Sequence, residues 1–264
     1  MMFTDTDEVN LEAQQIIDAK GRFLAQRQGR TPNQAIIDLA RLAKRPQPLL
    51  NIVTHNEPAL LLGQITLTDT YDPVAAALRC VRDGADGLAM FTDQRIYSKG
   101  MDDLLLVSRG INSPIICQDY ILNEYHVAEA RAAGASAIVV YSSMLDRPIL
   151  RRVVSAIQRW RMTAIVQVCT PEELHFASTL SPHVVAIGMD THFDAARDLP
   201  TLETLRDSIP YNVRMMPLGC IHRLEDVEAV ARLRPDAVIV DEKLLKSVPT
   251  YEAIRELLDY TAGA

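Results

Sequence analysis

The feature that most constrains the fold is a short apolar run that recurs eight times along the chain. Amphipathic segments separate the runs, and the starts recur about every 25 residues, the length of one strand plus one helix. Eight such units favour a closed parallel barrel over a doubly wound sheet, which usually has fewer strands. The runs are Leu60–Ile65, Gly87–Phe91, Pro114–Cys117, Ala137–Tyr141, Thr163–Val168, Val184–Ile187, Val213–Met216 and Ala237–Val240.

Residues at the ends of the intervening segments indicate helices. Asp72 precedes a proline at a predicted first helical position, where proline's missing N–H costs no hydrogen bond. Thr170 and Glu173 predict a capping box, in which the hydroxyl accepts from the amide of Glu173 and the glutamate reaches back to the amide of Thr170. Gly84 and Gly134 stand where a helix must end before the next strand, the usual C-cap position of glycine.

The part of the chain before the first run predicts additional helices. Residues 10–45 carry apolar side chains at helical spacing, so we expect helices that cover one end of the barrel. No Gly/Ser-rich linker or run of charges divides the chain. The sequence therefore predicts an α/β protein with a single domain, a (β/α)8 TIM barrel at 59–264 preceded by an N-terminal helical extension at 1–58.

Charge and composition limit the partners and the compartment. The formal net charge is −7, and nucleic acids and anionic membranes both favour a basic protein face, so neither is expected as a partner. No apolar run reaches the length of about 18 residues that indicates a membrane helix. The segment Met1–Asn10 lacks the apolar core of a secretory signal. Four widely separated cysteines predict reduced thiols in a cytoplasmic protein: Cys80, Cys117, Cys169 and Cys220.

Four motifs in the middle of the chain carry a family resemblance. Residues 71–73 (YDP) match an FDP motif, and residues 91–101 (FTDQRIYSKGM) match an LTDE…FxGS stretch. Residues 118–121 (QDYI) match KDFI, and residues 124–137 (EYHVAEARAAGASA) match PYQIxEARAAGADA. The chain therefore resembles the indole-3-glycerol phosphate synthase family. The resemblance implies a (β/α)8 barrel and a reaction that closes an indole ring on a carboxyphenylamino-deoxyribulose phosphate with loss of carbon dioxide and water.

By this resemblance, the family's catalytic positions hold residues of different chemistry. The glutamate and lysine of the first strand fall on Gln64 and Thr66, and the lysine that follows the third strand falls on Gln118. The glutamate of the fifth strand falls on Gln167, and the asparagine after the sixth strand falls on Asp190. Glutamine has the size of glutamate but no titratable proton, so the three glutamines cannot act as general acids or bases. We therefore expect little turnover of the family reaction.

The phosphate-binding positions depart from the family as well. The turn after the seventh strand, Ser-Glu-Ser-Gly in the family, becomes residues 217–220 and includes Gly219 and Cys220. The family's arginine after the sixth strand falls on His192, and its glycine after the eighth strand falls on Asp241. Two like unit charges about 4 Å apart repel by about 1–4 kcal/mol at surface-like dielectrics, so we expect Asp241 to disfavour phosphate. We also expect its carboxylate to accept amides of the following helix as an N-cap. These four residues are the candidate ligand-binding positions.

Alternative interpretations of the polar side chains stay open. In one interpretation, the three glutamines form a neutral hydrogen-bonding pocket for an uncharged ligand. In the other, they hydrogen-bond one another in a barrel without catalysis. Asp190 and His192 form an acid–base pair, or they are solvated loop residues. Cys169 and Cys220 are interpreted as small apolar side chains, because no adjacent base that would activate a thiol is recognisable.

Three functions are compatible with the sequence, so whether the chain is an enzyme stays open. The favoured hypothesis is a diverged family member that does not catalyse the family reaction and binds a small ligand or a protein partner. The second is an active indole-3-glycerol phosphate synthase, a carboxy-lyase of tryptophan biosynthesis, with an unusual residue set. The third is an enzyme that acts on another small molecule through Asp190, His192 or Asp241. No cofactor is implied, and no spacing such as H-x-x-x-H predicts a metal site.

Overall fold

The structure is a computed structural model. It describes residues 5–49, 59–65, 72–94, 99–188, 195–210, 212–241, 244 and 251–262. The predicted boundary between the extension and the barrel falls in residues 50–58, which lie outside the described ranges.

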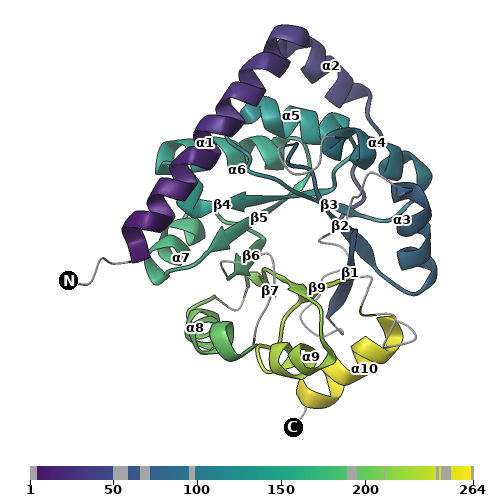
Figure 1. Ribbon diagram of the computed structural model, residues 1–264, viewed down its shortest axis with the longest axis vertical. Helices are drawn as coiled ribbons and strands as arrows, with labels where there is room; N and C mark the ends of the chain where they lie inside the picture. Colours follow the sequence, from purple (N-terminus) through teal and green to yellow (C-terminus); the bar gives the residue numbers. More distant parts are fainter. Residues whose placement is uncertain are drawn as a thin grey trace.

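The strands of the described residues form one parallel sheet that curves into a nearly closed barrel (Figure 1). Strand β7 pairs with β6, whereas β8 pairs with β9. Because β7 and β8 are consecutive pieces of one strand, interrupted at Leu218 and Gly219, this strand joins the two edges of the sheet. The predicted (β/α)8 barrel is confirmed. The strands are β1 Leu60–Ile65, β2 Gly87–Phe91, β3 Ile115–Gln118, β4 Ala137–Tyr141, β5 Thr163–Val168, β6 Val184–Ile187, β7 Arg214–Pro217, β8 Cys220–Ile221 and β9 Ala237–Asp241.

Helices surround the barrel, and one α-helix lies between each pair of successive barrel strands (Figure 1). Among the described helices, none has the length and apolar composition needed to span a membrane. The helices are α1 Asp5–Arg30, α2 Asn33–Leu42, α3 Pro73–Arg82, α4 Gly100–Gly110, α5 Glu124–Ala132, the 3-10 turn η1 Ser142–Met144, α6 Arg147–Arg159, α7 Pro171–Ser178, α8 Ala195–Asp207, α9 Leu224–Ala231 and α10 Tyr251–Ala262.

Two apolar layers follow from the alternation of side chains along each strand. One set, which includes Leu62, Val139 and Ile239, fills the inside of the barrel. The alternate set, which includes Leu61, Ile138 and Val238, packs under the surrounding helices. Because both faces of the sheet are buried, the strands read as continuous apolar runs in the sequence.

The predicted helix ends agree with the structure except at one side chain. The carboxylate of Asp72 accepts hydrogen bonds from the first amides of α3, and Gly84 and Gly134 adopt positive φ after α3 and α5. The hydroxyl of Thr170 accepts from the amide of Glu173, as expected. Glu173, however, does not complete a capping box. Its carboxylate accepts instead from the amide of Cys169 and from a serine of η1, at 2.8 Å in both cases, because these donors lie beside it at the end of the barrel.

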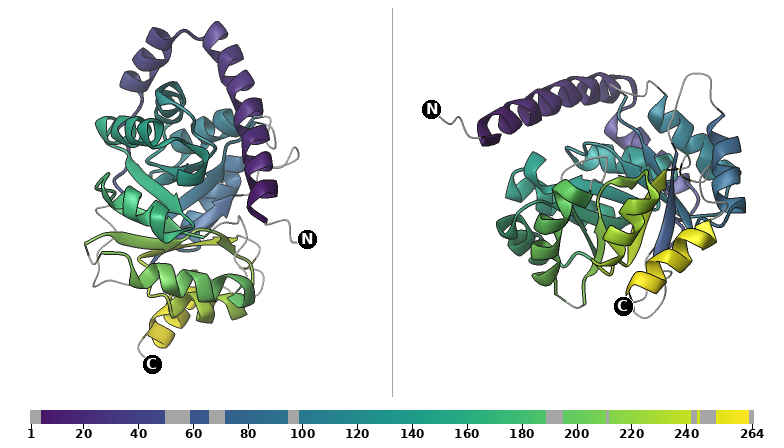
Figure 2. Two further views of the ribbon diagram at one scale, coloured as in Figure 1. Left: turned by 90° about the vertical axis from the view of Figure 1, so that its left-hand side faces the viewer. Right: turned by 60° about the horizontal axis from the view of Figure 1, so that its bottom comes forward.

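The N-terminal helices are present and lie outside the ring of barrel helices (Figure 2). Helix α2 packs on α5, while α1 runs past the carboxyl ends of the strands. Lys20 of α1 reaches Asp93 and Asp119, which lie within two residues of the ends of β2 and β3. The extension therefore covers part of the end at which barrels of this kind place their chemistry.

Candidate functional site

The carboxyl ends of the strands form the mouth of the barrel, and three glutamines lie just inside it. Gln64, Gln118 and Gln167 follow the inward-facing residues of β1, β3 and β5 in strict alternation. In such barrels, the four side chains of an interior layer come from alternate strands, so Leu218, after β7, completes this layer. The three glutamines are almost fully buried. We call them the amide layer.

Backbone carbonyls fix the orientation of two of these amides. Gln64 Nε2 donates to the carbonyl of Ala89 at 3.1 Å, and Gln167 Nε2 donates to that of Gly188 at 2.5 Å. Because the Nε2 atom of each of these two side chains faces the carbonyl oxygen to which it donates, the Oε1 atom on the other side of the amide faces away from that carbonyl. The Oε1 atoms of all three glutamines are buried without a hydrogen-bond partner. The interpretation that the glutamines satisfy one another is therefore wrong.

The next inward-facing residues form the rim above the amide layer. By the same alternation they are Phe91, Tyr141, Gly188 and Asp241. Burial, with nearby Tyr120 and Asp119 adding to it, raises the pKa of Tyr141, so its hydroxyl stays protonated at neutral pH. This side of the mouth therefore presents an aromatic wall with a neutral hydroxyl.

Asp241 is paired with a histidine that the sequence did not single out. Its Oδ2 lies 2.7 Å from Nδ1 of His222, and the carboxylate is buried while about a third of the imidazole is exposed. The register explains the contact. Ile221 of β8 pairs with Val240 of β9, so the residues that come next, His222 and Asp241, lie side by side. The expected N-cap role of Asp241 stays a prediction, because residues 242–243 lie outside the described ranges.

A second polar cluster lies on the outward side of the strand ends. Lys20 Nζ lies 2.5 Å from Asp119 and 3.3 Å from Asp93, and His126 Nε2 lies 3.2 Å from Asp119. All four side chains are almost fully buried. Burial alone would raise the pKa of Asp119, but the neighbouring side chains of His126 and Lys20 more than offset it and hold that pKa well below its usual value. We call these residues the rim network; it fastens α1 to the barrel.

Comparisons with known proteins place the chain in a family. A sequence model described as "Indole-3-glycerol phosphate synthase" matches residues 24–257. The indole-3-glycerol phosphate synthase of Mycolicibacterium vanbaalenii is 31% identical over 205 residues, which cover 75% of this chain and 72% of the relative. That of Mycolicibacterium smegmatis is 29% identical over 252 residues, covering 87% and 89%. The chain belongs to the indole-3-glycerol phosphate synthase family.

Solved structures of other enzymes share the fold at low sequence identity. The 3-keto-L-gulonate-6-phosphate decarboxylase of Vibrio cholerae superposes with a TM-score of 0.64 at 14% identity, covering 78% of this chain and 99% of that one. The 3-hexulose-6-phosphate synthase of Salmonella typhimurium gives 0.62 at 14% identity, covering 76% and 99%. These likenesses support the barrel fold and say nothing about activity.

Some of the positions that the resemblance assigns to catalysis or phosphate binding come together in the structure, and others lie outside the described residues. Gln64, Gln118 and Gln167 share the amide layer. Thr66, Asp190 and His192 fall in the ranges that the structure does not describe, so their predicted roles are untested.

The predicted ligand-binding positions after β7 and β9 are described in part. Gly219 is buried with φ of +129°, a conformation that favours glycine. It joins β7 to β8 at the break in the seventh barrel strand. Cys220 begins β8, but its side chain is outside the description. Asp241 ends β9 in the pair with His222.

The described cysteines near the mouth are poor nucleophiles. Burial raises the pKa of Cys117 to about 12 and that of Cys169 to about 11. Both thiols are therefore protonated at neutral pH, and Cys169 accepts a hydrogen bond from Gln167 Nε2 at 2.7 Å. The interpretation of Cys169 as an unreactive thiol is consistent with this geometry. Within the described part of the chain, no group of three or more His, Cys, Asp or Glu side chains converges as metal ligands.

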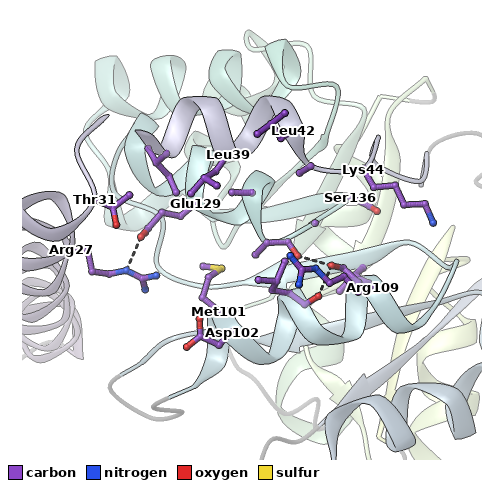
Figure 3. Close-up of a pocket in the computed structure, with 18 of the residues that line it drawn as sticks. Arg27, Thr31, Leu39, Leu42, Lys44, Met101, Asp102, Arg109, Glu129 and Ser136 are labelled. Atoms are coloured by element: carbon purple, nitrogen blue, oxygen red, sulfur yellow. Dashed lines mark hydrogen bonds and ion pairs between the residues drawn. The ribbon is translucent and has the colours of Figure 1, made fainter. Parts of the chain in front are cut away.

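A cavity of about 890 Å³ lies elsewhere, between α2 and α4 on the flank of the barrel (Figure 3). Its lining includes none of the family's catalytic positions. We take the mouth as the candidate family site despite this cavity, because barrel enzymes place their chemistry at the carboxyl ends of the strands.

Proposed function

We propose that this family member does not catalyse the family's ring closure and instead binds a small ligand or a protein partner. The observation that carries the proposal is the amide layer. Gln64, Gln118 and Gln167 lie at the inward positions where the resemblance puts titratable side chains, and none of them can give or take a proton.

The expected loss of activity is large. Each general acid or base contributes about 10²–10⁴-fold to a rate, so replacing several of them leaves little turnover. Asp241 adds a second obstacle, because its buried carboxylate stands at the end of β9, where the family is expected to hold phosphate. Chemistry and substrate binding are then both disfavoured.

The same residues suggest what a small ligand in the mouth would be. Three buried carbonyl-type oxygens without partners favour a ligand that donates hydrogen bonds, since an unmade hydrogen bond costs about 1–3 kcal/mol for each buried group. A neutral ligand fits better than an anion, because the carboxylate of Asp241 lies beside the layer. The oxygens are covered, so a ligand reaches them only if the atoms above them move.

The test is a turnover assay on the purified protein with the carboxyphenylamino-deoxyribulose phosphate substrate. The Mycolicibacterium smegmatis relative serves as the positive control. We expect no indole glycerol phosphate above background. Turnover within about tenfold of ordinary enzymes, which typically run at about 1–10³ per second, would restore the active synthase as the leading hypothesis.

A second candidate is an enzyme that acts on another small molecule, and the contact between His222 and Asp241 favours it. A buried carboxylate on Nδ1 fixes the tautomer of an imidazole and prepares its other nitrogen for proton transfer. Nitrogen NMR of the protein labelled at histidine tests this arrangement. We expect a fixed Nδ1–H tautomer that becomes mixed in Asp241→Asn; a mixed tautomer in the unaltered protein would remove the support for this candidate.

We also propose a cytoplasmic location. The support is that neither Cys117 nor Cys169 takes part in a disulfide. Detection of the protein in a fractionated cell extract tests it.

A further inference from the structure

The cavity on the flank of the barrel has features of an interaction surface. It lies between the arm formed by α1 and α2 and the wall formed by α4 and α5 (Figure 3). Its lining comprises 26 residues. One side of a standard protein–protein interface has about 20–30 residues, so this surface has the extent that a macromolecular partner needs.

Exposed apolar side chains gather along the arm side of this cavity. Phe23 is 39% exposed, Leu39 is 51% exposed and Leu42 is 83% exposed, and all three belong to the lining. A single exposed leucine is ordinary, but apolar side chains that collect in one concave surface indicate a binding site. The arm therefore offers a partner apolar area that the chain itself does not cover.

The charges around the cavity are opposite to those of the chain. The lining holds five cationic residues against two acidic ones, a local net charge of +3 in a chain whose net charge is −7. Arg30, Arg45 and Arg109 are exposed, and none of them has a carboxylate partner among the described residues. They come from α1, from the segment after α2 and from α4, so they surround the cavity. Arginine is enriched in the energetically dominant parts of interfaces.

One buried ion pair holds the base of this surface. Arg27 Nε lies 2.6 Å from Glu129 Oε1, and Glu129 is almost fully buried on α5 (Figure 3). The other carboxylate oxygen of Glu129 is buried without a hydrogen-bond partner. A partner that donates a backbone or side-chain N–H to this oxygen would remove the cost of leaving it unpaired.

We propose that this cavity is a docking groove for an acidic, amphipathic segment of a protein partner. Apolar side chains of the segment pack on Phe23, Leu39 and Leu42, and its carboxylates pair with the three arginines. Such recognition follows the helix-in-groove mode, in which apolar anchors recur every three or four residues. The negative charge of the rest of the chain keeps other copies and anionic surfaces at a distance, whereas the groove attracts an acidic segment.

The test uses a fluorescein-labelled amphipathic helical peptide of leucine and glutamate, about 18 residues or five turns long. A matched peptide has lysine in place of every glutamate. Binding to the full chain is measured by fluorescence anisotropy at low and high salt. We expect the glutamate peptide to bind, the lysine peptide to bind at least tenfold more weakly, and the affinity to fall with salt because the charges are exposed.

Variants assign the binding to the groove. The triple variant Arg30→Glu, Arg45→Glu and Arg109→Glu is expected to weaken binding at least tenfold, and Arg152→Glu, an exposed arginine on α6 outside the groove, is the matched control. Leu39→Ser with Leu42→Ser is expected to weaken it by a similar factor without unfolding, because both side chains are largely exposed.

Four results would overturn the proposal. They are no binding of the glutamate peptide up to millimolar concentration, equal binding of both peptides, unchanged binding by the triple variant, and self-association of the chain in sedimentation that the triple variant abolishes. Binding to phosphatidylserine vesicles without binding to the peptide would also overturn it in favour of a membrane surface. None of these outcomes depends on the barrel mouth, so the docking groove and the proposed function stand or fall separately.

Discussion

Replacing Lys20 with methionine is expected to lower the free energy of unfolding by about 3–5 kcal/mol, the range for breaking a buried ion pair by removal of one partner. Methionine retains most of the apolar stem, so the change isolates the amino group. Lys20 is 4% exposed and bridges Asp119 at 2.5 Å and Asp93 at 3.3 Å. Its removal leaves two buried carboxylates without this ammonium group, while the contact of Asp119 with His126 stays in place.

The pH dependence of this loss has a definite sign. The pKa of Asp119 is depressed below its ordinary value of 3.8 in the folded protein. Its stabilisation is therefore fully present above the unfolded pKa and is lost as the pH falls through the lower, folded pKa. Lys20→Met removes the part of this stabilisation that Lys20 supplies, so the difference between the two proteins is expected to hold from pH 7 down to about pH 4 and to shrink below it.

Urea denaturation at pH 7 and at about pH 2.5, inside the range where the stabilisation of Asp119 is being lost, measures both effects. Trp160, the single tryptophan, is a suitable fluorescence probe because it packs against the cluster that joins α1 and α5. Lys44→Met is the control, since Lys44 is exposed and its amino group donates to the neutral side chain of Asn112; the effect of this change is expected to stay within about 0.5 kcal/mol. A loss below about 1 kcal/mol in Lys20→Met at pH 7 would refute the view that the rim network holds α1 in place.

Two further substitutions test the mouth. Introducing the side chains that the resemblance predicts, with Gln64→Glu, Thr66→Lys, Gln118→Lys and Gln167→Glu, is expected not to give ring closure, because we expect Asp241 still to disfavour the substrate phosphate; a fully active quadruple variant would contradict this. Asp241→Gly is expected to bind inorganic phosphate at least tenfold more tightly in calorimetry and to melt at a lower temperature, because the contact with His222 is lost. Equal phosphate affinity of both proteins would show that Asp241 does not repel phosphate.

The barrel could be predicted because its determinants are local in the sequence. Five of the eight predicted strands have the observed bounds, and β3 begins and ends one residue later than expected. The seventh barrel strand was predicted as one run at Val213–Met216, whereas the structure divides it into β7 and β8. The break at Leu218 and Gly219 follows from the positive φ of that glycine, which a pattern of apolar residues does not reveal.

The polar contacts could not be predicted because they join residues that are distant in the chain. In the sequence, Lys20 looks like one of several solvated basic residues of α1, and only the fold brings it to Asp93 and Asp119. The contact of His222 with Asp241 carried a usable signal. The seventh strand of the barrel ends in β8 and the eighth is β9, and these two strands are parallel neighbours. Aligning their carboxyl ends places His222 beside Asp241.

Adjacent residues at the end of β3 show how a neutral mouth and a charged rim occur side by side in this fold. Gln118 and Asp119 point to opposite sides of the sheet because side chains alternate along a strand. The inward residue is a neutral amide in the mouth, whereas the outward residue remains ionised in the rim network with Lys20 and His126. The charges that fasten α1 to the barrel therefore lie on residues other than those to which the resemblance assigns catalysis. If the proposed exchange of inward charges for amides is right, it leaves the contacts that hold α1 on the rim in place, because those contacts use the outward side chains.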